Sequence, residues 1–240
     1  MTELLYQSDS YLKIFDAAVL KLDTENHAIL LDRTAFYPGG GGQPFDLGFI
    51  HHLGQAISVK RAKNIGGEVW HTLAEDMALP PIDAAINAEI DWERRYKTMR
   101  THTAMHILCG VVFRDYGALV TGGDMEPLLG RMDFEFETMS ADLVKVIEQA
   151  VNKEVNAARE IRIAILPREK AFQIPDLIRT KINLLPAGIE NIRTVEIVGL
   201  DLQADGGTHV KNTSEVGVLR ITDYKSKGKI NKRIYLEISE

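Results

Sequence analysis

The sequence predicts an α+β fold in two units, a small β-barrel-like unit over residues 1–90 and an α+β unit over residues 91–240. Short strand-like runs separated by turns fill the first unit, and the second mixes two long helical patterns with sequential strands. A length of 240 residues exceeds the about 100–150 of one ordinary domain. With 45% hydrophobic and 26% charged residues, the composition excludes disorder, collagen and coiled coil.

The first unit shows β-branched or alternating apolar residues between turns. A glycine-rich segment, residues 36–44, interrupts these runs and predicts a loop. Pro80 and Pro81 mark a junction, and we place the boundary near residue 90, so that the strand-like run 83–90 stays in the first unit. The other predicted strands are residues 11–22, 28–32 and 49–59.

Two long helices are expected in the second unit. The first begins at Glu93 with a basic segment and continues to Phe113. The second runs from Ala141 to Arg159, where apolar residues recur at helical spacing and Ser140 supplies an N-cap. Strands are predicted over residues 161–166, 193–198, 216–222 and 233–238.

The net charge of the whole chain and the distribution of that charge between the two units point to different partners. A formal net charge of -6 argues against a nucleic-acid partner, because phosphate binding depends on Lys and Arg. However, residues 1–90 hold 6 basic against 12 acidic residues, and residues 91–240 hold 22 of each. Basic residues of the second unit cluster in three places, which predicts a phosphate-binding face. The clusters are Arg94, Arg95, Lys97 and Arg100; Arg159, Arg162, Arg168 and Lys170; and Lys225, Lys227, Lys229, Lys232 and Arg233.

The compartment is expected to be the cytoplasm. A single cysteine, Cys109, cannot form an internal disulfide, and the first residues lack the basic start and apolar run of a signal peptide. No apolar stretch approaches the ~20 residues that cross a bilayer. We therefore expect a soluble protein without a membrane partner.

Two pairs of candidate metal ligands stand far apart in the sequence. His102 and His106 lie four residues apart on a predicted helix, so both imidazoles project from one face. Asp205 and His209 have the same spacing around a Gly-Gly turn. Together they supply the four donors of a tetrahedral zinc site, and water takes the fourth place if only three bind. Thr103 follows His102 where a zinc protease needs Glu, which disfavours a metalloprotease.

Cys109 offers an alternative ligand. It lies seven residues after His102, near the same helix face, so a set of His106, Cys109 and His209 is conceivable. Its apolar neighbours favour instead a buried structural cysteine.

Four segments of the chain resemble the alanyl-tRNA editing proteins of the AlaX family, which are free-standing relatives of the editing domain of alanyl-tRNA synthetase. The order and spacing of the segments cover nearly the whole chain, and the glycine-rich first unit makes it similar to the medium-length class. The matching segments are residues 34–46, 100–108, 166–172 and 201–217.

The resemblance implies a trans-editing deacylase that holds one Zn²⁺ per chain. Such an enzyme hydrolyses the ester joining a wrong amino acid, serine or glycine, to the 3′ adenosine of alanine tRNA, so the partner is the acceptor end of tRNA(Ala) and not DNA. The zinc ligands of the family match His102, His106 and His209, and Asp205 stands where the family usually has cysteine. Carboxylate oxygen is an accepted zinc donor but harder than thiolate, which predicts lower zinc selectivity and a stronger Lewis acid.

The resemblance also implies residues that contact the substrate. Thr34 and Gln43, with the backbone N–H groups of Gly40, Gly41 and Gly42, are expected beside the editing pocket, where a hydrogen bond to the serine hydroxyl would reject alanine.

Further contacts are expected from the second unit. Thr103 and Thr208 adjoin ligands, and each either bonds the substrate or water or supports its neighbouring histidine. Arg100 and Arg168, from the basic clusters, are expected to contact the tRNA. Zinc would either acidify a bound water or polarise the substrate, and both roles stay open.

Two rival functions stay open. A metal site weakened by Asp205 would leave a protein that binds tRNA without hydrolysing it. Alternatively, the chain would deacylate a different mischarged tRNA, such as that for threonine or proline.

Overall fold

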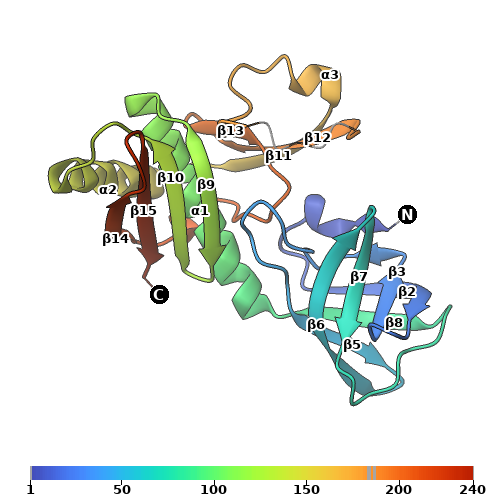
Figure 1. Cartoon of the computed structure of the whole chain (residues 1–240). Coiled ribbons are helices and arrows are strands. Elements are labelled where there is room, and N and C mark those ends of the chain that lie inside the picture. Colours follow the sequence, from blue (N-terminus) through green and yellow to red (C-terminus); the bar gives the residue numbers. More distant parts are fainter. Residues whose placement is uncertain (1, 183–184, 186–187, 240) are drawn as a thin grey trace. The chain divides into compact units, whose positions relative to one another are not determined.

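The computed structural model describes residues 2–182, 185 and 188–239 (Figure 1). The chain divides into two compact units, Met1–Tyr96 and Lys97–Glu240. The division falls inside a helix, a few residues beyond the boundary at residue 90 that the sequence predicts. Among the described helices, none has both the length and the apolar character needed to span a membrane.

The first unit is built on a closed barrel of six strands in the order β2-β3-β7-β6-β5-β8, which confirms the predicted small β-barrel. Closure pairs every strand on both sides and leaves no free edge. Two short strands, β1 and β4, pair in parallel outside it. The strands are β1 Glu3–Leu4, β2 Ile14–Asp23, β3 Ala28–Leu31, β4 Arg33–Thr34, β5 Gly48–His52, β6 Gln55–Ile65, β7 Glu68–Leu73 and β8 Ala85–Ile90, and η1 is a 3-10 helix over Leu5–Gln7.

The predicted strand 49–59 is wrong, because β5 and β6 form a hairpin in place of one strand. Leu53 and Gly54 turn the chain with φ values of 48° and 77°, as a two-residue hairpin turn requires. Leucine rarely adopts this conformation, so the turn carries little sequence signal. Strand β7 was not predicted, although Val69, His71 and Leu73 alternate inward along it.

A buried ion pair between Asp46 and Arg95 fixes the base of the glycine-rich loop, residues 36–44. Gly39 to Gly42 have φ values of 83°, 133°, 59° and 88°, a run that other residues rarely adopt. Asp46 accepts a hydrogen bond of 2.5 Å from Tyr37 N and pairs with the fully buried Arg95, which also donates to Ala35 O at 2.6 Å. The loop is therefore fixed at its base, and Arg95 of the first basic cluster is used inside the protein.

The second unit joins helices to two antiparallel sheets, which confirms the α+β class. One sheet has the order β14-β15-β10-β9, and the other β11-β12-β13 (Figure 1). Helix α1 begins in the first unit and supplies the long helix of the second. The elements are α1 Trp92–Tyr116, β9 Val120–Glu126, β10 Leu129–Glu135, α2 Ala141–Asn156, β11 Ile161–Pro167, α3 Arg168–Ala171, β12 Asn191–Ile197, β13 Asp201–Ala204, η2 Thr213–Glu215, β14 Leu219–Ser226 and β15 Asn231–Ile238.

Helix α1 is buried all round over residues 101–112, because both sheets pack against it. A Cβ atom on Gly123 or Gly130 would meet the Met105 side chain at 3.2 or 3.1 Å, so the hairpin of β9 and β10 lies close to one side. On the other side, a Cβ atom on Gly110 would meet the Cβ atom of Asp201 at 3.0 Å. This close approach brings the start of β13 against the helix.

Helix α2 begins as predicted, with the Ser140 hydroxyl accepting a hydrogen bond of 3.2 Å from Leu143 N. It ends at Asn156, not at Arg159. Arg159 lies beyond the helix and donates to the Glu154 carboxylate at 2.6 Å and to Val198 O at 2.9 Å. The predicted strand 216–222 likewise begins later, at Leu219, because the 3-10 helix η2 precedes it.

Candidate metal centre

Four side chains of the second unit converge from two distant segments. His102 and His106 project from the same face of α1, one turn apart. Asp205 follows the end of β13, and Gly206 and Gly207 turn the chain so that His209 returns beside it. Gly207 N donates to Asp205 Oδ2 at 2.6 Å, which stabilises the turn.

The four residues offer ligand atoms that all lie within 4.8 Å of one another. Asp205 Oδ1 lies 3.4 Å from His102 Nε2 and 3.9 Å from His106 Nε2, and Asp205 Oδ2 lies 3.1 Å from His209 Nε2. All three imidazoles therefore turn Nε2 toward the carboxylate. Zinc bond lengths of ~2.0–2.1 Å place tetrahedral ligand atoms about 3.4 Å apart, so the donor set and its spacing fit zinc.

Burial prepares two of the three imidazoles for a cation. It lowers the pKa of His102 well below its usual value and that of His209 to about 4, so both rings are neutral near pH 7. Burial would also lower the pKa of His106, but the carboxylates of Asp201 and Asp205 outweigh it and raise that pKa. Burial would raise the pKa of Asp205, but the imidazoles beside it outweigh this effect and hold the pKa well below the usual value. Neutral imidazole and ionised carboxylate are the forms that bind metals.

Thr103 supports the centre from behind. Its hydroxyl lies 3.2 Å from His209 Nδ1 and accepts a hydrogen bond of 3.3 Å from Val210 N. The sequence predicted that Thr103 either contacts the substrate or supports the adjacent His102. In the structure it contacts His209, which is distant in sequence. Thr208 is fully buried next to the same histidine.

Arg193 adds a positive charge that sequence reasoning did not predict. It is buried on β12, and its Nη1 donates to Asp205 O at 2.9 Å and lies 3.7 Å from Asp205 Oδ2. A guanidinium beside the carboxylate favours its ionised form. The sequence gives only a weak signal for this role, because β12 also carries Thr194 and Glu196 and does not single out its arginine.

Cys109 lies outside the group of four. It is buried, its Sγ accepts a contact of 3.3 Å from Gln203 Nε2, and burial raises the pKa of its thiol. A thiol held protonated is a poor metal ligand, so these observations favour the buried structural cysteine over the alternative ligand set.

The predicted substrate residues of the first unit lie in or beside the barrel. Thr34 is fully buried, and its hydroxyl bonds His71 Nε2 at 2.8 Å and accepts from Phe36 N at 3.1 Å. Gln43 is buried, and its backbone exchanges hydrogen bonds of 3.0 and 2.9 Å with Gly40. Gly40 and Gly41 are exposed and Gly42 is half-buried, so the tip of the loop meets solvent.

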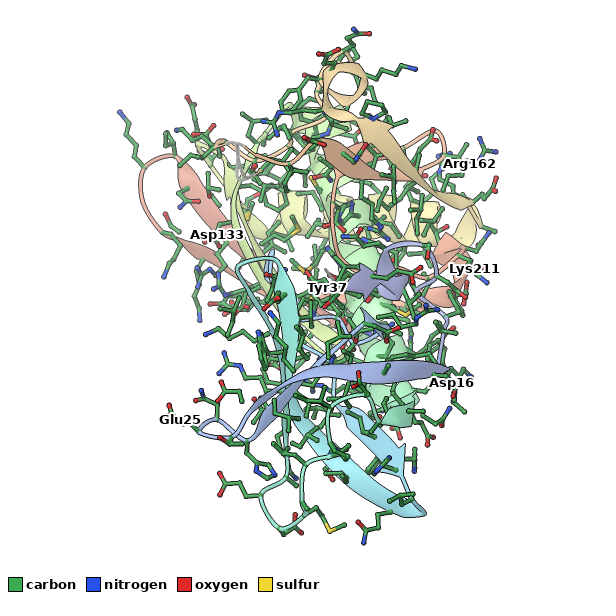
Figure 2. The ribbon with its side chains drawn as sticks, turned by 90° about the vertical axis from the view of Figure 1, so that its right-hand side faces the viewer. Asp16, Glu25, Tyr37, Asp133, Arg162 and Lys211 are labelled. Carbon is green, nitrogen blue, oxygen red and sulfur yellow. The ribbon has the colours of Figure 1, made fainter. Side chains whose placement is uncertain are left out.

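Several predicted phosphate contacts are used within the second unit. Arg100 donates to Val216 O at 2.9 Å and to Ser239 O at 2.7 Å. Arg168 donates to Ile189 O at 3.2 Å and stacks over the Phe172 ring. Arg162 forms an ion pair with Glu160 at 2.7 Å. Lys211, which like Arg162 is labelled in Figure 2, is exposed.

Comparison with known proteins gives these features a family. Residues 192–235 match the "Threonyl and Alanyl tRNA synthetase second additional domain", and residues 12–94 match "tRNA synthetases class II (A)". The barrel, the α+β unit and the His/Asp centre thus define a protein of the class related to these synthetase domains.

Full-length relatives narrow the class. The chain is 41% identical to the alanyl-tRNA editing protein AlaX-M of Saccharolobus solfataricus and 34% identical to that of Methanosarcina acetivorans, with 99% of each chain covered. It is also 36% identical to the alanine–tRNA ligase of Ignicoccus hospitalis over 92% of this chain and 24% of the ligase. The chain belongs to the family of alanyl-tRNA editing proteins.

Proposed function

We propose that the protein is a trans-editing hydrolase that removes serine, and also glycine, from mischarged alanine tRNA with one Zn²⁺ bound per chain. The observation that carries the proposal is the buried donor set of His102, His106, Asp205 and His209 within 4.8 Å. The full-length relatives are named alanyl-tRNA editing proteins, which supports alanine tRNA as the tRNA of the substrate.

Zinc held by these four residues would supply a Lewis acid, which either acidifies water or polarises an oxygen of the substrate. The protein's own residues hold and orient the reacting groups. Arg193 keeps the Asp205 carboxylate ionised, and Thr103 orients His209. An aminoacyl ester is already reactive, so much of the remaining task is to position the 3′ end of the tRNA. Good orientation of the reacting groups lowers the activation free energy by several kcal/mol.

For the rejection of alanine, we propose that Gln43 recognises the serine hydroxyl, while the backbone N–H groups of Gly41 and Gly42 approach the terminal adenosine. The N–H group of Gly40 is already donated to Gln43 O at 3.0 Å and shapes the loop. Polar groups left unpaired by alanine would disfavour its binding. Thr34 would act with His71, its hydrogen-bond partner at 2.8 Å, by keeping the base of this loop in place. Arg100 and Arg168 would contribute positive charge toward the tRNA.

The test is a deacylation assay on alanine tRNA charged in parallel with serine, glycine and alanine. We expect rapid release of serine, slower release of alanine, loss of activity with a chelator and recovery with Zn²⁺. The variant His102→Ala should abolish hydrolysis, with the half-buried His51→Ala as a matched control that retains it.

Each rival function has a distinct outcome in this assay. A Ser-tRNA(Ala) ester left intact by zinc-loaded protein that still binds the tRNA would support the binding protein and contradict the hydrolase. Faster release from mischarged threonine or proline tRNA would identify a different substrate.

A further inference from the structure

Asp201 is a buried carboxylate that the four-residue centre does not include. It opens strand β13, its side chain is 0% exposed, and its Oδ2 lies 3.5 Å from His106 Nδ1. This is the ring nitrogen opposite Nε2, which faces the centre. Among the described residues, this buried Nδ1 atom has no hydrogen-bond partner, and Asp201 Oδ2 is the carboxylate oxygen that faces it.

Two hydrogen-bond donors hold the side chain of Asp201. Arg179 Nε donates to Oδ1 at 3.3 Å, and Gln203 Nε2 donates to Oδ2 at 2.6 Å. The positive charge of the Arg179 guanidinium beside Oδ1 favours the ionised carboxylate. An ionised carboxylate can only accept hydrogen bonds, at both of its oxygens.

The ionised carboxylate determines the proton position on His106. Because Asp201 Oδ2 can only accept, Nδ1 of His106 must carry the hydrogen that faces it. The neutral ring then has its lone pair on Nε2, 3.9 Å from Asp205 Oδ1. A metal-binding imidazole needs this arrangement, with one nitrogen free to bind and the other donating to an outer acceptor.

Helix α1 and the segment around Arg179 determine the position of the Asp201 carboxylate. Gly110 of α1 has no side chain to obstruct the start of β13, where an added Cβ atom would lie 3.0 Å from the Cβ atom of Asp201. Arg179 is itself fixed, since it lies over the Phe113 ring at 3.9 Å and donates to Asp176 O at 2.5 Å. The contact with His106 is therefore built by the fold and not by a mobile surface side chain.

We propose that Asp201 is a positioning residue, whose carboxylate holds His106 in the Nδ1–H tautomer and directs its Nε2 lone pair at the metal centre. The inference rests on the metal half of the proposed function and does not depend on the substrate. It also assigns Arg179 and Gln203 a role, because they hold the carboxylate in place.

The test compares Zn²⁺ affinity, measured by competition with a chromophoric chelator, between the wild-type protein and Asp201→Asn. Asparagine keeps the size but turns an NH₂ group toward donors, and loss of an outer acceptor typically weakens metal affinity 10–100-fold. The matched control is Asp133→Asn on β10, labelled in Figure 2, which also removes a buried carboxylate and breaks a pair with Arg233 at 2.6 Å. This control should stay within twofold of the wild type.

A second measurement needs no variant. Nitrogen-15 NMR of the metal-free wild-type protein at alkaline pH, where the ring is neutral, should show the Nδ1–H tautomer at His106. An Nε2–H tautomer there, or a folded Asp201→Asn protein that binds Zn²⁺ as tightly as the wild type, would overturn the inference.

The two proposals fail separately. If the wild-type protein leaves Ser-tRNA(Ala) intact while Asp201→Asn binds Zn²⁺ more weakly than the wild type, the hydrolase function alone is contradicted. If the wild-type protein hydrolyses Ser-tRNA(Ala) while Asp201→Asn binds Zn²⁺ as tightly as the wild type, the positioning role alone is contradicted.

Discussion

Asp205 occupies the middle of the centre, within 4 Å of all three imidazoles and of Arg193. In the proposed zinc centre, this one carboxylate would serve as the fourth donor, and its charge also balances that of Arg193. Because carboxylate oxygen is a hard ligand, this centre should discriminate less between zinc and manganese than one with a thiolate.

Exchange of this residue tests that prediction. Asp205→Ala should weaken Zn²⁺ binding at least ~10-fold, because loss of an outer partner alone typically costs 10–100-fold. Asp205→Cys should retain one zinc per chain and raise the preference for Zn²⁺ over Mn²⁺, measured as the ratio of the two dissociation constants. The control is Glu169→Ala, an exposed carboxylate on α3.

Two results would contradict the ligand assignment. The first is an Asp205→Ala protein that keeps wild-type Zn²⁺ affinity. The second is loss of the metal in Cys109→Ser, which would bring the thiol back into the ligand set.

At the scale of elements, the hairpin of β14 and β15 carries the third basic cluster. Lys227 N bonds Asn231 O at 2.8 Å to close the turn, and Lys227 and Lys229 are both exposed. Lys232 and Arg233 are used internally, the first bonding Gly228 O at 2.9 Å and the second pairing with Asp133. The tip of the hairpin is thus the part of this cluster that can meet phosphate.

We expect the double variant Lys227→Gln/Lys229→Gln to weaken tRNA binding and to reduce the salt dependence of the affinity. Each lost phosphate contact lowers the slope of log K against log salt by about 0.7–0.9, so the slope should fall by about 1–2. Lys145→Gln/Lys153→Gln, two exposed lysines on α2, removes the same charge as a control. If both double variants lost the same tRNA affinity, the loss would reflect net charge alone and would contradict a phosphate contact at the hairpin tip.

The sequence predicts long periodic elements well and irregular ones poorly. The start of α2 is confirmed at Ser140, because an N-cap and a helical apolar pattern are local signals. The hairpin of β9 and β10 and strand β13 were missed, since Gly122 and Gly123 interrupt β9 and β13 is only four residues long. Their strand form depends on packing against α1, which local patterns do not report.

The same distinction holds for the site. Four-residue spacing indicated both ligand pairs, and the structure brings all four side chains together. Asp201, Arg193 and the contact of Thr103 with His209 were not predicted, because each depends on segments that meet only in the folded chain. The three basic clusters were over-interpreted, because a charge run does not show which residues pair internally.

At the scale of the whole molecule, the two units differ in what they hold. Both tryptophans, Trp70 and Trp92, lie in the unit Met1–Tyr96, whereas all four candidate ligands lie in Lys97–Glu240. Tryptophan fluorescence therefore reports on the first unit, whereas the proposed metal binding would stabilise the second. The acidic excess also belongs to the first unit, which explains why the net charge of -6 was a poor guide to partners.

This separation predicts an unequal response to metal during thermal unfolding. Free Zn²⁺ at 100 times its dissociation constant should stabilise the second unit by about 2.7 kcal/mol, a shift of about 8 °C. We expect circular dichroism at 222 nm to show most of this shift and tryptophan fluorescence to show less. Equal shifts of both signals would mean that the two units unfold as one.

The two halves of the metal centre are made at different times. About 100 residues separate His106 from Asp205 and His209, and a ribosome adds about 5–20 residues per second, so the second pair emerges roughly 5–20 s after the first. A nascent chain therefore carries His102 and His106 for several seconds before Asp205 and His209 have been synthesised. Capture of the proposed zinc ion by all four residues would then have to wait until synthesis has passed His209.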